Sequence, residues 1–145
     1  MPATLYTVGY EGLSLPEFLD RLVQAGISRL VDVRELPLSR RPGFSKTKLA
    51  AALGELGIEY VHARPLGNPK SNRERYRAGD VEGGAEVYRR SLHNGSYPAL
   101  LKLAEGLDDE PTCLMCFERD HEHCHRAVIV ESLAQLRPDV PVAHL

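Results

Sequence analysis

The segment CLMCFERDHEHCHR, residues 113 to 126, decides how this chain folds and where its chemistry lies. The apolar run from Cys113 to Phe117 is typical of a buried strand, and the apolar periodicity that begins near Ala127 predicts a helix. The polar residues between them therefore form a strand-to-helix loop, which ends in a Cys-His-Arg triplet. Loops of this kind line the ligand sites of open α/β sheets. We expect the functional site here.

The same alternation of strand and helix runs through the rest of the chain. A capping box at Ser14 to Glu17 marks the start of the first helix, and Gly26 marks its end. Ser45 can cap the start of the second helix, which ends at Gly57. A Gly- and Arg-rich loop follows the third strand. Expected strands lie at residues 5–8, 29–33, 59–63, 113–117 and 142–145. Expected helices lie between residues 14 and 26, between 45 and 57, and at 85–92, 98–107 and 124–136.

This order predicts one α/β domain over residues 1–145, an open, mostly parallel sheet with helices on both faces. The topology is Rossmann-like, but Gly9-Tyr10-Glu11-Gly12 is not a dinucleotide fingerprint. We therefore expect no dinucleotide and assign no cofactor. In a parallel sheet the residues that follow the strands share the carboxyl edge.

Composition indicates a water-soluble domain. The chain has 145 residues, of which 43% are hydrophobic and 26% are charged, as in ordinary globular proteins. No apolar stretch approaches the roughly 18 residues that a membrane helix needs, and the first residues do not resemble a signal peptide. Three cysteines are too few for a disulfide framework. These features predict a cytoplasmic location, reduced thiols and no membrane partner.

Basic charge is concentrated in two segments that follow strands. Residues 34–48 and residues 64–77 each hold five cations against one acid, a net charge of +4, although the whole chain carries −2. If both segments reach the carboxyl edge, they favour an anionic ligand. The candidate phosphate-binding or other ligand-binding residues are Tyr10, Arg34, Arg40, Arg41, His125 and Arg126.

Several spaced motifs resemble one known family. They are Tyr6 to Gly12, Asp32-Val33-Arg34 with the following Pro37 to Phe44, Gly57 to Tyr60 leading to Leu66-Gly67, and Cys116-Phe117-Glu118 with Cys124-His125-Arg126. Together they are similar to the domain-of-unknown-function family 488, nearly from end to end. The resemblance implies a small α/β domain of bacterial type with an unassigned activity. This chain has Asn68-Pro69 where the family pattern leads us to expect a second glycine.

The three cysteines have different expected roles. Cys113 and Cys116 form a C-x-x-C, but residues three apart on a strand face opposite sides, which argues against a thioredoxin-type pair. Cys113 to Arg119 has the spacing of a phosphatase loop, yet its apolar interior favours a buried strand for Cys113. Cys124 falls at a helix start beside Arg126, where the positive end of the helix dipole stabilises a thiolate.

Cys124 is thus a candidate nucleophile, and simple packing of the helix start against the sheet is the alternative. A redox-sensitive pair with Cys116 is a further interpretation. The loop histidines add imidazole ligands, but His121 to His123 lie in a charged stretch without a standard metal-ligand spacing, so we assign no metal.

Acidic and aromatic residues at the same edge complete the candidate site. Glu11 and Glu118 could act as an acid–base pair, and Tyr10 and Phe44 could stack on a base. Asp32 interrupts an apolar strand, so it must be hydrogen-bonded or paired if buried, with Arg34 two residues away on the same face. For each glutamate, surface ion pairing is the alternative.

Two functions remain open. The first is binding of a phosphate-bearing small molecule or nucleic acid at the carboxyl edge, with enzymatic activity based on Cys124, Glu11 and Glu118. The second is a non-catalytic binding or regulatory module. The substrate, the reaction and the oligomeric state do not follow from the sequence.

Overall fold

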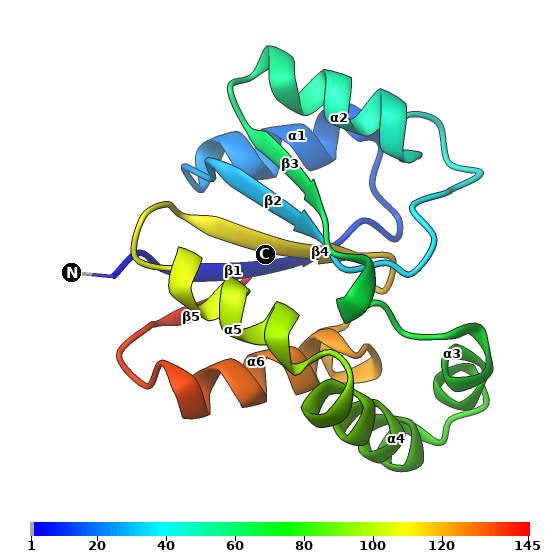
Figure 1. Ribbon diagram of the computed structural model, residues 1–145. Helices are drawn as coiled ribbons and strands as arrows, with labels where there is room; N and C mark the ends of the chain where they lie inside the picture. Colours follow the sequence, from blue (N-terminus) through cyan, green and yellow to red (C-terminus); the bar gives the residue numbers. More distant parts are fainter. Residues whose placement is uncertain (1) are drawn as a thin grey trace.

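The computed structural model describes residues 2–145 and contains a five-stranded, all-parallel sheet (Figure 1). Its spatial order is β3-β2-β4-β1-β5, so β4 lies between β2 and β1 at the centre. The strands are β1 (Leu5–Gly9), β2 (Arg29–Asp32), β3 (Glu59–His62), β4 (Thr112–Cys116) and β5 (Val142–His144). The α/β class with an open, parallel sheet, expected from the alternation of elements, is confirmed.

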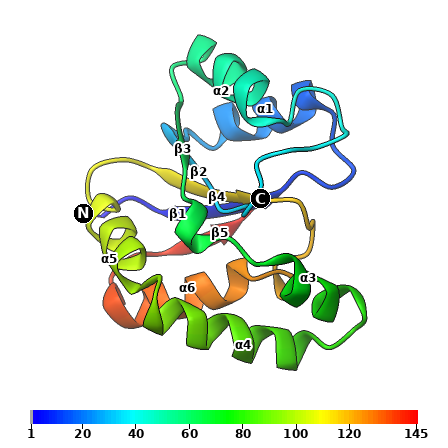
Figure 2. The same ribbon diagram turned by 45° about the vertical axis from the view of Figure 1, so that its right-hand side comes forward.

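Helices cover both faces of the sheet, as Figures 1 and 2 show. On one face lie α1 (Leu15–Gln24) and α2 (Lys46–Glu55). On the other lie α4 (Val81–Asn94), α5 (Tyr97–Gly106) and α6 (Arg126–Leu136). A short helix, α3 (Lys70–Arg77), packs against α4, and single 3₁₀ turns occur at η1 (Arg64–Leu66) and η2 (His121–His123).

The sheet divides the core into two apolar clusters. The central strand β4 contributes to both, because alternate side chains of a strand point to opposite faces. Cys113 and Met115 join the cluster that includes Phe18 of α1, whereas Leu114 and Cys116 join the cluster on the opposite face. All five residues of β4 are buried, which explains why this strand reads as a continuous apolar run.

Local signals set the ends of several helices. Ser14 and Glu17 form the expected capping box at the start of α1. Ser45 does occupy the N-cap position of α2, but its hydroxyl bonds to Ser39 and makes no cap hydrogen bond. The break expected at Asn94-Gly95 separates α4 from α5.

The Gly- and Arg-rich loop expected after the third strand contains a helix, α3, so that part of the sequence-based prediction is wrong. The helix has no apolar periodicity to reveal it, because its sequence KSNRERYR is almost entirely polar. It is held instead by a buried amide cluster. The Asn72 side chain donates to Asn68 Oδ1 at 2.8 Å and to the Gly84 carbonyl at 2.9 Å.

At the carboxyl edge the backbone at the end of β1 packs directly against the backbone of the loop that follows β4. Tyr10 and Glu11 donate backbone hydrogen bonds to the carbonyls of Cys116 and Phe117. Gly9 leaves no space beside this loop, since a Cβ atom there would lie 1.7 Å from the Glu118 carbonyl oxygen. The absence of a side chain at Gly9 therefore positions Glu118 and the residues after it.

Replacing Gly9 by alanine should move this loop and destabilise the fold. Overpacking of this kind lowers the free energy of unfolding by about 1–3 kcal/mol, measured by urea denaturation. Gly54→Ala in α2 is the matched control, because a Cβ atom there meets nothing within 4 Å and alanine favours a helix. Equal stability of the two variants would show that the contact at Gly9 does not constrain the loop.

Candidate functional site

The predicted site forms where β4 ends and α6 begins. Cys116 is the last residue of β4, and Cys124 stands two residues before the first residue of α6. The intervening loop folds back through η2, where the Asp120 carboxylate accepts from the backbone N–H of Glu122. The fold-back leaves Cys116 Sγ and Cys124 Sγ 2.7 Å apart. The proximity that a redox-sensitive pair of Cys116 and Cys124 requires is therefore present.

The two thiols are electrostatically unequal. Burial raises the pKa of the Cys124 thiol, but the hydrogen bond from Cys116, together with His125 and Arg126, outweighs burial and holds it well below the ordinary value. Burial and the contact with Cys124 both hold the pKa of Cys116 well above its ordinary value. These opposite pKa directions favour Cys116 as the hydrogen-bond donor and Cys124 as the acceptor.

His125 places an imidazole next to this thiolate. Its Nε2 lies 2.8 Å from the Val33 carbonyl oxygen, a contact that requires a proton on Nε2. Its Nδ1 therefore faces Cys124 Sγ, 3.5 Å away. Burial lowers the pKa of His125, but the Cys124 charge and hydrogen bond reverse this and leave it raised. Tyr88 packs edge-on against the ring, with centroids 5.0 Å apart.

Arg126 is a buried cation with neutral hydrogen-bond partners. Only 1% of the residue is exposed. Its guanidinium donates to Thr7 Oγ1 and to the Glu118 carbonyl, and its backbone N–H lies 3.5 Å from Cys124 Sγ. No ion pair joins it to a carboxylate within residues 2–145, and its Nε has no partner there. Burial lowers the pKa of Arg126, but the charges of Cys116 and Cys124 outweigh burial and leave it raised, so the thiol pair compensates this buried cation.

Glu118 connects the thiols to an open pocket. Its Oε2 accepts from Cys116 Sγ at 3.3 Å, and burial together with the Cys124 charge raises the pKa of the carboxyl. The pocket has a volume of about 460 Å³. It is lined by Glu11, Tyr76, Arg77, Gly79, Val81, Phe117, Glu118, Asp120 and His123. The thiol pair thus lies one side chain behind the wall of the pocket.

The two glutamates predicted as an acid–base pair both line this pocket. Glu11 accepts a hydrogen bond from the backbone N–H of Arg119 at 3.0 Å and is exposed. The ion pairs within residues 2–145 include neither Glu11 nor Glu118, so the alternative of surface salt bridges does not describe them. Their catalytic role stays a prediction.

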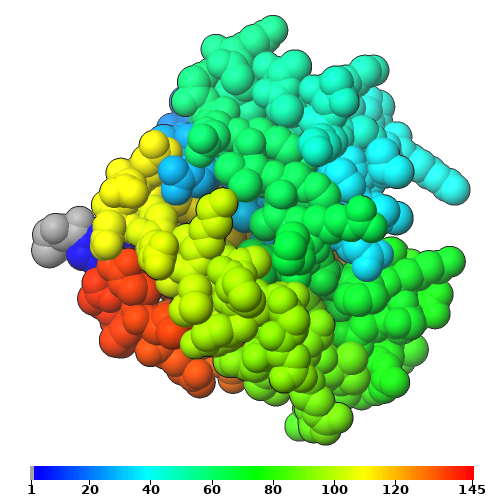
Figure 3. Space-filling model, viewed as in Figure 1, coloured from blue at the N-terminus to red at the C-terminus, as the bar shows by residue number. Residues whose placement is uncertain are grey.

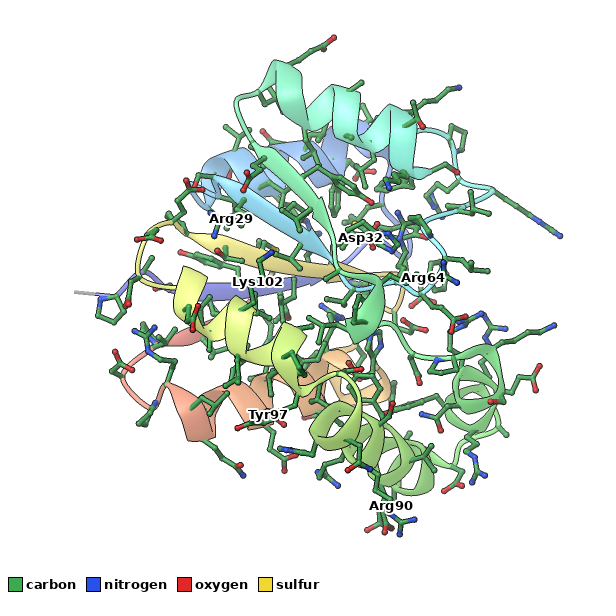
Figure 4. The ribbon with its side chains drawn as sticks, in the orientation of Figure 1. Arg29, Asp32, Arg64, Arg90, Tyr97 and Lys102 are labelled. Carbon is green, nitrogen blue, oxygen red and sulfur yellow. The ribbon has the colours of Figure 1, made fainter. Side chains whose placement is uncertain are left out.

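Asp32 and Arg34 form the buried pair that the sequence suggested. Arg34 donates through Nε and a terminal nitrogen to the two carboxylate oxygens of Asp32, at 2.9 and 2.7 Å. Tyr60 also donates to Asp32, and Arg34 donates to the Tyr10 hydroxyl. Figure 4 shows Asp32 at the carboxyl end of β2. This fork–fork geometry uses most of the donors that Arg34 would offer to a phosphate.

The remaining predicted ligand-binding residues are divided between core and surface. Tyr10 and Phe44 are buried and stack on one another, with centroids 4.4 Å apart, so a base could stack there only by displacing core contacts. Arg40 and Arg41 are exposed, and Arg41 also donates to the Leu13 carbonyl. In the space-filling view, the loop between β2 and α2 protrudes at the right in cyan (Figure 3).

Sequence reasoning missed Tyr76 at the pocket and Tyr88, which packs against His125. Tyr76 of α3 lines the pocket, and its hydroxyl is buried without a partner within residues 2–145. Burial raises the pKa of Tyr76 to about 12, with a further contribution from the Cys124 charge. Gly84 makes room for its ring, since a Cβ atom there would lie 2.8 Å from Tyr76 Cε2. The sequence signal that could have pointed to Tyr76 is its position between Arg75 and Arg77 in an otherwise polar stretch.

A metal ion is poorly matched to the thiol pair. Ligand atoms of Cys116, Glu118 and Cys124 lie within 4.8 Å of one another, so these three residues have suitable chemistry. However, tetrahedral coordination with metal–sulfur bonds of about 2.3 Å separates two sulfurs by roughly 3.8 Å. The observed 2.7 Å is well below that separation.

Comparison with known proteins gives a family but no activity. The family model described as "Domain of unknown function DUF488" matches residues 14–133. The chain belongs to the DUF488 family. This confirms the resemblance drawn from the spaced motifs, and the match includes the Cys116-to-Arg126 segment. Neither the curated proteins nor the solved structures offer a match. Within residues 2–145, no helix of this DUF488 protein is both long and apolar enough to cross a membrane.

The charge assignment at the thiol pair predicts one early thiolate. Ultraviolet absorbance of thiolate during a pH titration should show a single group ionising below the ordinary pKa of cysteine, and Cys124→Ser should remove it. Cys116→Ala and His125→Gln should each shift this ionisation to higher pH, because each removes a group that stabilises the thiolate. Cys113→Ser is the matched control and should leave it unchanged. Ionisation in the ordinary range for all three thiols would contradict the assignment.

Proposed function

We propose that this DUF488 protein is a cysteine-dependent enzyme in which Cys124 is the nucleophile and the ligand enters the pocket beside Glu118. The observation that carries the proposal is the buried group of Cys124, His125 and Arg126. The imidazole and the backbone N–H of Arg126 contact Cys124 Sγ, and the charge of Arg126 helps to lower its pKa. A thiolate stabilised in this way is the activated form of a cysteine nucleophile. A cysteine that only packed a helix against the sheet would need neither cation.

The flanking groups support specific roles. His125 shares a proton with Cys124 through Nδ1, while the Val33 carbonyl fixes its orientation through Nε2. A cysteine–histidine pair of this kind needs a third group to orient the base. Glu118 carries a raised pKa and lies between the thiols and the pocket, which suits a carboxylate that takes up a proton and then gives it to a leaving group. These roles are part of the proposal.

For the ligand we propose a phosphate-bearing molecule, either a small molecule or a nucleic acid. The support is the concentration of exposed cations along the carboxyl edge. Arg40 and Arg41 lie on the loop after β2. Arg64 lies just after β3, where Figure 4 labels it. The pocket lining holds Arg77 and His123 but also three carboxylates. The phosphate would therefore contact the cations outside the pocket, and the reacting group would enter it.

Alkylation tests the nucleophile. With limiting iodoacetamide near neutral pH, mass spectrometry should show Cys124 modified before Cys113, which is fully buried and has a pKa raised by burial. His125→Gln should slow modification of Cys124 at neutral pH and have little effect above the ordinary pKa of cysteine. Preferential modification of Cys113, or equal modification of the three thiols in the folded protein, would refute the proposed nucleophile.

A ligand panel tests the phosphate class. Nucleotides, sugar phosphates and short oligonucleotides should include a compound that raises the melting temperature and slows alkylation of Cys124, and its affinity should fall as salt rises. The double variant Arg40→Ala/Arg41→Ala should weaken binding, whereas Arg90→Ala on α4, remote from the edge in Figure 4, should not. Binding that does not respond to salt would exclude the electrostatic basis. Binding without any effect on Cys124 would favour a non-catalytic module.

A further inference from the structure

Cys116 is a second thiol that a simple cysteine nucleophile does not need. It lies on the same face of the sheet as Cys124, and only 1% and 2% of the two residues are exposed. The Sγ–Sγ distance of 2.7 Å is close to the roughly 2.05 Å of a disulfide bond. Oxidation would therefore require only a small movement of the two side chains.

We propose that Cys116 is a resolving thiol, which closes a Cys116–Cys124 disulfide after a hydroperoxide has oxidised Cys124. This inference rests on the proposed nucleophile Cys124 and adds a redox reaction to it. In the disulfide Cys124 is no longer a free thiolate, so the proposed enzyme would be inactive until an external thiol reduces the bond.

The burial of both sulfurs selects the class of oxidant. A protein disulfide must bring its own sulfur into line with the attacking thiolate, and no open surface surrounds Cys124 to receive it. A hydroperoxide is small enough to enter through the pocket beside Glu118, which has a volume of about 460 Å³. The thiolate form of Cys124 is the species that peroxides oxidise.

The first step transfers one oxygen atom. The Cys124 thiolate attacks one peroxide oxygen, the O–O bond breaks, and an S–O bond forms. The leaving alkoxide takes a proton from the imidazolium of His125 and departs as an alcohol, or as water when the oxidant is hydrogen peroxide. Cys124 is now a sulfenic acid, and His125 is neutral.

The second step closes the disulfide. Glu118 Oε2 lies 3.3 Å from Cys116 Sγ and accepts its proton, and the resulting thiolate attacks Cys124 Sγ. The S–O bond breaks, and the departing hydroxide takes the proton from Glu118 and leaves as water. Over both steps two thiols lose two electrons in total and the peroxide gains them. Two equivalents of an external thiol would later return the pair to the reduced state.

The test treats the full-length protein with equimolar hydrogen peroxide, quenches it, alkylates it under denaturing conditions without reductant and measures peptide masses. In the wild-type protein the peptide or peptides that carry Cys116 and Cys124 should lose the mass of two hydrogens and take up no alkylating reagent, whereas Cys113 remains alkylated. Dithiothreitol should restore alkylation of both. Cys113→Ser is the matched control and should behave like the wild type.

Single variants separate this inference from the proposed nucleophile. Cys116→Ser should accumulate a Cys124 sulfenic acid that dimedone traps, and then a sulfinic acid, because no resolving thiol remains. Cys124→Ser should leave Cys116 reduced. If wild type and Cys116→Ser form the same sulfenic or sulfinic acid without a disulfide, the inference is wrong and the nucleophile stands. If iodoacetamide modifies Cys124 but hydrogen peroxide does not, the inference alone again fails. If neither reagent modifies Cys124, both proposals fail.

Discussion

The carboxyl edge of this protein depends on the burial of the Arg126 guanidinium. Arg126 is the first residue of α6. Its guanidinium donates to Thr7 of β1 and to the Glu118 carbonyl in the loop after β4, and so it links these three parts of the chain. A cation removed from water is costly unless an anion or several dipoles compensate it. Here the Thr7 hydroxyl and the carbonyls of Glu118 and Arg119 provide the dipoles, and the charges of Cys116 and Cys124 raise the pKa of Arg126 against the effect of burial. The same requirement that stabilises the edge therefore also lowers the pKa of Cys124.

This electrostatic arrangement gives two chemically identical side chains different properties. Cys116 and Cys124 are both buried and share one contact, but the His125 imidazole and the Arg126 backbone N–H lie beside Cys124, while the Glu118 carboxyl lies beside Cys116. Positive charge stabilises one thiolate and negative charge opposes the other. This asymmetry favours Cys116 as the donor and Cys124 as the acceptor.

The arginines at the carboxyl edge illustrate how burial redistributes charge that the sequence places together. Arg34 neutralises Asp32 inside the core, and Arg126 compensates the thiol pair, so these two cations act mainly on the protein itself. Arg40 and Arg41 remain at the surface. A charge count along the chain cannot make this distinction, because it depends on which side chains the fold removes from water.

The sequence by itself determined the α/β class, the meeting of Cys116 and Cys124 after β4 and the opposite facing of Cys113 and Cys116. These features follow from local periodicity and from the alternation of side chains along a strand. The helix α3, the pocket and the enclosing Tyr76 were decided only by tertiary structure, because contacts such as Asn68–Asn72 and Tyr76–Gly84 hold them without an apolar pattern. The thiol asymmetry likewise needed the fold, since a pKa depends on distances and burial that join Val33, Thr7 and Arg126 across the sheet.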